Sequence, residues 1–126
     1  MFMPRPTLLV AEREPLQALS TRKLVLETGK FNVITAHSTQ EALDLFHLFP
    51  NISVAVLATD PDNTIDCARI ADAIKKATQR IPVIALSPVA SDICNFADHT
   101  ISSHEPETLL HLIRSLVGDP RTIDGK

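Results

Sequence analysis

Histidine is the residue type in this chain with the widest capacity for metal chemistry. Zinc sites in proteins are built from imidazole nitrogens and thiolates. No two histidines here show the spacing of four residues that places two zinc ligands on one helix face beside a third ligand. We interpret His104 and His111 as surface residues of a predicted last helix, and we predict no metal site. The five histidines are His37, His47, His99, His104 and His111.

Ser87 is the best-placed candidate for a nucleophile, because it follows an apolar run. A serine hydrolase would need a GxSxG turn and a glycine near the oxyanion, and the chain has neither. Its few glycines also leave no Gly-rich loop that could hold nucleotide phosphates. We therefore predict no enzymatic activity and no cofactor. The three glycines are Gly29, Gly118 and Gly125.

Composition limits the other classes of function. The chain has 126 residues, 44% of them hydrophobic, and a net charge of −3, which is typical of one soluble domain. Lys and Arg are scattered, and Trp and Tyr are absent, so we predict no nucleic-acid partner. Cys67 and Cys94 have no zinc or CxxC spacing, which is typical of a reducing cytosol. Without a signal peptide or a long apolar run, we predict a cytoplasmic protein with no membrane partner.

The elements that must position any site follow from the hydrophobic pattern. Short apolar runs predict strands, and they alternate with helical patterns along the chain. This alternation predicts an α/β fold, a parallel sheet with helices on both faces. We expect a short extension over residues 1–6, one domain over 7–118 and a disordered tail over 119–126. The predicted strands cover residues 7–11, 31–35, 52–58, 81–86 and 99–102.

Helix starts are marked by capping residues. Pro15 begins a predicted helix that ends at Gly29, and Pro106 begins the last one. Ser38 and Glu41 form a capping box, and a third helix begins at about Asp66. The helix after Ser38 carries an apolar stripe that we assign to the core. Its members are Ala42, Leu45, Phe46 and Phe49.

Four segments in this order resemble the response-regulator receiver domain. The resemblance covers residues 7–117, nearly the whole chain. It implies a flavodoxin-like or CheY-like five-stranded parallel sheet of order 2-1-3-4-5, and a role in two-component signalling. The helix between the fourth and fifth strands is shorter here than the family usually has. The segments are LLVAEREP (8–15), HSTQEALDLF (37–46), PVIALS (82–87) and PETLLHLI (106–113).

The resemblance also implies a phosphorylation site, whose residues are poorly matched. In the family, an acidic pair after the first strand holds Mg²⁺, and an aspartate ending the third strand accepts the phosphoryl group. The acidic pair falls on Glu12 and Arg13. The phosphoacceptor position falls on Ala58, or on Leu57 if Pro61 is the anchor. Neither alanine nor leucine can be phosphorylated.

Two further family positions contact the phosphate. The hydroxyl position is matched by Ser87. The lysine position, which supplies positive charge, falls on Ser102 or Ser103. Only Glu12 and Ser87 therefore keep the family's residue types, so the mapping predicts a degenerate crevice.

Arg13 and Asp60 leave two alternatives open. Arg13 either turns into the crevice, pairs with Glu12 or Asp60 and repels Mg²⁺, or points to solvent. Asp60 lies two residues beyond Ala58 and is either a displaced phosphoacceptor or, as we favour, a turn residue of the Asp60-Pro61-Asp62-Asn63 type.

These residues predict a signalling module that binds protein partners without being phosphorylated. We expect a homodimer through the last strand and last helix as one form of this binding. Two alternatives are a receiver that is phosphorylated on Asp60, and a pseudo-receiver whose crevice binds a small anion or metabolite through Arg13, Ser87 and Ser102 or Ser103.

Overall fold

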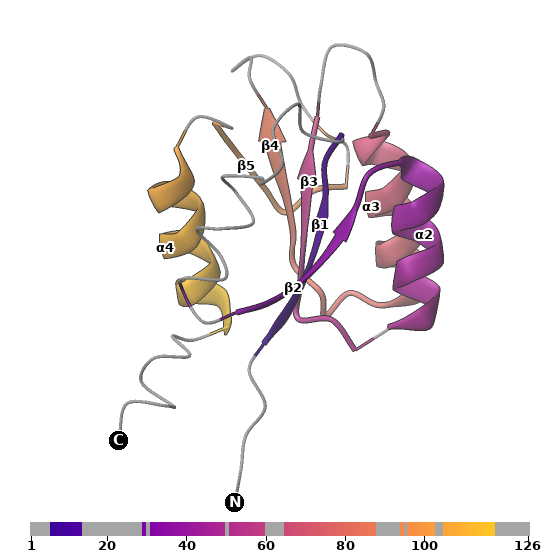
Figure 1. Cartoon of the computed structure of the whole chain (residues 1–126), viewed down its shortest axis with the longest axis horizontal. Helices are drawn as coiled ribbons and strands as arrows, with labels where there is room; N and C mark the ends of the chain where they lie inside the picture. The colour runs from indigo at the N-terminus through magenta and orange to yellow at the C-terminus, as the bar shows by residue number, and fades with distance from the viewer. Residues whose placement is uncertain are drawn as a thin grey trace, which may run out of the picture.

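The core of the protein is a parallel five-stranded sheet of order β2-β1-β3-β4-β5 (Figure 1). The structure is a computed structural model that describes residues 6–13, 29, 31–49, 51–59, 65–87, 94, 96–102 and 105–117. Both the predicted α/β class and the predicted strand order are confirmed. The strands are β1 (Thr7–Ala11), β2 (Asn32–Ala36), β3 (Val54–Ala58), β4 (Val83–Ser87) and β5 (His99–Ser102).

Helices cover both faces of the sheet. Helices α2 (Thr39–Leu48) and α3 (Cys67–Ala77) lie on one face, and α4 (Pro106–Val117) lies on the other (Figure 1). Within the described ranges, no helix is long and apolar enough to cross a membrane. Outside those ranges lie most of the predicted helix 15–29, most of the segment with the shortened helix between β4 and β5, and the tail 119–126.

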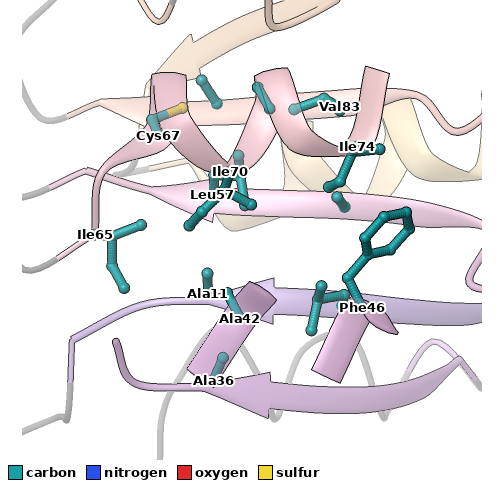
Figure 2. Close-up of a cluster of buried hydrophobic side chains, with 14 of the residues drawn as sticks. Ala11, Ala36, Ala42, Phe46, Leu57, Ile65, Cys67, Ile70, Ile74 and Val83 are labelled. Carbon is teal, nitrogen blue, oxygen red and sulfur yellow. The ribbon is translucent and has the colours of Figure 1, made fainter. Parts of the chain in front are cut away.

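Alternation along the central strands builds two cores. Ala55 and Leu57 of β3 face α2 and α3, whereas Val54 and Val56 face α4. In the first core, Phe46 of α2 and Ile70 of α3 pack toward the sheet, as Figure 2 shows. All five residues of β3 and of β4 are buried, which explains their near-continuous apolar sequences.

Side-chain caps set the starts of the two adjacent helices. The Ser38 hydroxyl accepts a hydrogen bond from the Glu41 N–H (3.0 Å), and Glu41 Oε1 accepts one from the His37 N–H (2.6 Å). In α3, the Asp66 carboxylate accepts from the Arg69 N–H at 3.1 Å. These bonds confirm both predicted helix starts.

Phe49 does not belong to the core, contrary to the sequence prediction. It is the C-cap of α2, with φ −127° and ψ 69°, so its backbone has already left the helix. The apolar stripe therefore ends at Phe46, which is buried, while Phe49 is 48% exposed. The helical repeat predicted that Phe49 would lie on the buried face of α2, but the helix ends before this residue.

Candidate functional site

The candidate site is the crevice beyond the carboxyl ends of the strands, where ligands of open α/β sheets bind. Strand register places its residues in a row along these strand ends, at two adjacent levels. Ala11 pairs with Leu57, so the next residues, Glu12 and Ala58, lie at the same level at the ends of β1 and β3. Ala58 pairs with Leu86, so Ser87 and its partner Ser102 lie one residue further along β4 and β5.

Glu12 is held by the end of β2. Its N–H donates to the Ala36 carbonyl (2.9 Å), and its own carbonyl accepts a hydrogen bond from His37 Nδ1 (3.1 Å). Glu12 is 6% exposed, one of two buried polar or charged residues among those described, and it has interactions of its own. His37 thus has a structural role in fixing the crevice backbone, which the sequence pattern did not indicate.

Arg13, the next residue, is exposed. The sequence left open whether its guanidinium enters the crevice or points to solvent. The structure places Arg13 at the surface beside the buried Glu12, where it also has interactions. Arg13 is therefore an exposed neighbour of the buried Glu12, and both interpretations of its guanidinium remain predictions.

Ala58 ends β3 with a methyl group where a carboxylate would be needed for phosphorylation. It is 7% exposed and belongs to the core that faces α4. Thr59 then joins β3 to β4, because its N–H (2.9 Å) and its hydroxyl (3.1 Å) both donate to the Leu86 carbonyl. These two hydrogen bonds to one carbonyl fix the chain direction at the end of β3. No sequence pattern indicated this role of Thr59.

Ser87 and Ser102 supply the hydroxyls of the row. Ser87 is 4% exposed, Ser102 is half-buried, and both have interactions. Ser103, the alternative for the lysine position, lies outside the described residues. Asp60 also lies outside them, so its two interpretations both stand as predictions.

The described residues of the crevice do not fit Mg²⁺. This cation requires several oxygen ligands and, in sites that bind phosphoryl groups, one or two carboxylates. In the row, Glu12 has the carboxylate, while Ala58 contributes a methyl group and Arg13 carries a positive charge. Within the part of the chain that the structure describes, no three His, Cys, Asp or Glu residues are grouped so that they could hold a metal ion.

A polar cluster lies at the opposite, amino-terminal end of β4. The Asp98 carboxylate accepts hydrogen bonds from the Val83 N–H (2.7 Å) and contacts Lys75 Nζ at 2.6 Å. Lys75 also donates to the Ile81 carbonyl (2.9 Å). Burial alone raises the pKa of Asp98, but the hydrogen bonds from Lys75 and Val83 outweigh it and hold this pKa below its usual value of 3.8.

Cys67 and Cys94 form a disulfide, with their Cα atoms 5.9 Å apart. Their spacing had suggested unpaired cysteines, typical of a reducing cytosol, and no sequence pattern indicated this pairing. Cys67 is the first residue of α3, and Cys94 lies in the connection from β4 to β5, 27 residues later. No local motif marks the pair, because only the packing of α3 on this connection brings the two residues together.

A groove separates β5 from α4. It is lined by His99 and Ile101 from the strand and by Glu107, His111 and Leu112 from the helix. In the described part of the sheet, β5 is an edge strand.

Several solved structures of similar shape are receiver domains. A response regulator receiver domain protein from Clostridium thermocellum has 23% identity and a TM-score of 0.74, and the match covers 94% of this chain and 98% of that one. The response regulator TrrA from Thermotoga maritima, in complex with Mg²⁺–BeF, has 23% identity and a TM-score of 0.70, with 88% and 98% covered.

A CheY-like receiver domain protein from Methanospirillum hungatei has 19% identity and a TM-score of 0.72, with 97% and 96% covered. No family model and no curated protein matches the chain. Similarity at this level of identity establishes the fold and leaves activity to the residues. The chain therefore has the fold of response-regulator receiver domains, over nearly the full length of both the chain and these neighbours.

Proposed function

We propose that this protein is a receiver-like signalling module that acts through protein–protein contacts and is not phosphorylated. The observation that carries the proposal is Ala58. It occupies the end of the central strand β3, buried and level with Glu12, where a phosphoryl acceptor would need an oxygen nucleophile. The receiver fold supports the signalling role, and the proposal makes the protein a binding module without enzymatic activity.

The rest of the row supports the same conclusion. A phosphoryl group carries negative charge and is stabilised by cations aimed at it. Ser102 stands at the end of β5, at one of the two positions mapped to the family's lysine, and offers a hydroxyl instead of an ammonium group. Arg13 is exposed. The described crevice keeps the Glu12 carboxylate and the Ser87 hydroxyl, but it has no nucleophile at Ala58 and no lysine at Ser102, the two groups on which phosphoryl transfer depends.

Partner binding is assigned to the face formed by β5 and α4. The groove between them and the edge position of β5 support this assignment. One assembly of this kind is a homodimer through the last strand and last helix. We expect sedimentation to show a dimer that His111→Glu weakens, because His111 is exposed in the groove. His47→Glu, an exposed histidine on α2, should leave the dimer intact, and equal effects of both variants would contradict the assignment.

The proposal is tested by incubating the protein with Mg²⁺ and a small phosphodonor and then measuring its intact mass. A receiver domain that has the acceptor aspartate serves as the positive control. The expected result is an unchanged mass in conditions that modify the control. A stoichiometric phosphoryl adduct would contradict the proposal.

The Asp60 alternative is separated from other acceptors by a matched pair of variants. If an adduct forms, Asp60→Ala should abolish it only when Asp60 is the acceptor, whereas Asp62→Ala should retain it. The anion-binding alternative predicts that inorganic phosphate raises the unfolding temperature, since a ligand that binds only the native state stabilises it. Calorimetry is the suitable method because the chain has no Trp or Tyr.

A further inference from the structure

The disulfide connects two parts of the protein that belong to different elements. Cys67 begins α3, close to the crevice end of the sheet, and Cys94 lies in the connection from β4 to β5. Both belong to the core between the sheet and α3, where Cys67 is 6% and Cys94 is 9% exposed. Figure 2 shows the Cys67 side chain at the first turn of α3. We propose that this disulfide is a reversible redox site, which small thiols open in the native protein so that Cys94 is no longer tied to α3.

The position of Cys67 favours its sulfur as the leaving group. Cys67 is the first residue of an 11-residue helix, directly after the N-cap Asp66. The amide groups and dipole of a helix N-terminus stabilise a thiolate, and a stabilised thiolate leaves a disulfide faster. The Asp66 carboxylate acts in the opposite direction, although it is engaged by the Arg69 N–H. Neutralising Asp66 should therefore ease reduction.

Backbone strain at Phe96 is a second, independent reason to expect that the disulfide is reduced reversibly. Its φ is 74°, the one positive φ of a non-glycine residue among those described, and its side chain is 57% exposed. A left-handed phenylalanine is strained and persists only where its surroundings impose it. Phe96 stands in a turn that the Ala97 N–H closes by donating to the Cys94 carbonyl (3.3 Å); the disulfide holds Cys94 at the start of this turn, and Asp98 follows its end. The Asp98 N–H donates to the Val83 carbonyl (2.8 Å), and its carboxylate accepts from the Val83 N–H.

Reduction removes the constraint on one side alone. The disulfide breaks at Cys94, while both hydrogen bonds between Asp98 and Val83 remain. Phe96 can then return to a negative φ as the hydrogen bond between the Ala97 N–H and the Cys94 carbonyl opens, and the strain that it releases favours the reduced state. The start of β5 keeps its position, because Asp98 anchors it independently of Cys94.

The chemistry is thiol–disulfide exchange and needs two equivalents of a monothiol such as glutathione. The first thiolate attacks Cys94 Sγ, the less covered of the two residues, and forms a mixed disulfide while Cys67 Sγ leaves and takes up a proton. A second thiolate attacks the glutathione sulfur of the mixed disulfide and releases Cys94 as a thiol. The protein gains two electrons and two protons, and glutathione disulfide carries the oxidised sulfurs.

The first experiment measures the reduced fraction of the folded protein in buffers of reduced and oxidised glutathione. Acid quenching, alkylation and intact mass give the fraction, and circular dichroism confirms that the protein stays folded. The expected result is a reduced fraction that rises with the glutathione ratio while the protein remains folded. Resistance to reduced glutathione until denaturant is added, or unfolding that coincides with reduction, would overturn the proposal.

Three variants test the two structural reasons. Phe96→Gly removes the strain and should lower the reduced fraction at a given ratio several-fold, because glycine adopts positive φ without a steric penalty. Phe49→Gly is the matched control, because Phe49 is an exposed phenylalanine with φ −127°. It should leave the reduced fraction at a given glutathione ratio unchanged. Asp66→Asn keeps the cap, removes its charge and should raise the reduced fraction. If Phe96→Gly and Phe49→Gly behave alike, the strain argument is wrong.

Hydrogen exchange then tests what reduction releases. We expect faster exchange in the peptide that spans Cys94 and Phe96 after reduction, with little change in β1 and β3. The variant Cys67→Ser/Cys94→Ser should show the fast pattern with or without glutathione. If the variant does not fold, the comparison of oxidised and reduced wild-type protein is sufficient. Unchanged exchange in that peptide, or equal acceleration throughout the sheet, would contradict the release.

Discussion

The two ends of strand β4 use polar groups in different ways. At the amino end, the partly exposed Asp98 carboxylate is engaged by Lys75 and Val83 and joins α3, β4 and β5. At the carboxyl end, Ser87 lies level with Ser102, one residue beyond the level at which Ala58 contributes only a methyl group. A carboxylate therefore anchors the amino end of β4, whereas Ala58, the position mapped to the phosphoacceptor, has none. The sheet forms with alanine at that position, and the contacts of Asp98 hold its amino end.

Ala58→Asp tests the carboxyl end and has the largest expected effect. A carboxylate at this buried position should lower the free energy of unfolding by about 2–3 kcal/mol, because an ionised group loses most of its hydration there. Ala58→Asn, which has nearly the same size without charge, is the control and should cost less. The gap between the two variants should narrow toward acid pH, as the aspartate becomes neutral. Urea denaturation measures both, and equal stability of Ala58→Asp and wild type would show that the crevice accepts a carboxylate.

Asp98→Ala tests the amino end. We expect a loss of about 2 kcal/mol in unfolding free energy, since the change removes the side-chain acceptor of the Val83 N–H and the carboxylate partner of the largely buried Lys75. Asp72→Ala is the matched control, because Asp72 pairs with the exposed Lys76 (3.0 Å), four residues away on α3. That pair should contribute about 0.5 kcal/mol or less. Similar losses of unfolding free energy in the two variants would show that Asp98 contributes no more to stability than Asp72 does.

The pH dependence of stability gives the smallest expected effect. The folded-state pKa of Asp98 lies below its usual value of 3.8, so its ionised form stabilises the fold. This contribution is fully present above the unfolded pKa and is lost as pH falls through the folded pKa. The stability difference between wild type and Asp98→Asn should be constant above about pH 5 and shrink below it. A stability difference that grows toward acid pH would show that ionised Asp98 does not stabilise the fold.

Much of the fold was predictable because its signals are local. The apolar runs predicted β1 and β5 at their observed bounds and the other strands to within two residues. Ser38 and Asp66 predicted the starts of α2 and α3. Phe49 was assigned wrongly to the core because its spacing fits the helical repeat, although its backbone is no longer helical.

The candidate site was predictable only in part, because its contacts depend on tertiary packing. The row of Glu12, Ala58 and Ser87 follows from strand ends, and the mapping found it. The pairing of Cys67 with Cys94 and the bonds of Asp98 join residues that are distant in sequence. No spacing rule indicates such contacts before the elements are packed.

Intact mass decides whether this protein is phosphorylated. The full chain is incubated with Mg²⁺ and a small phosphodonor, beside a receiver domain that has its aspartate. We expect the control to gain a phosphoryl group while this protein keeps its mass. A stoichiometric adduct on this chain would show that it retains an acceptor and would contradict the proposed function.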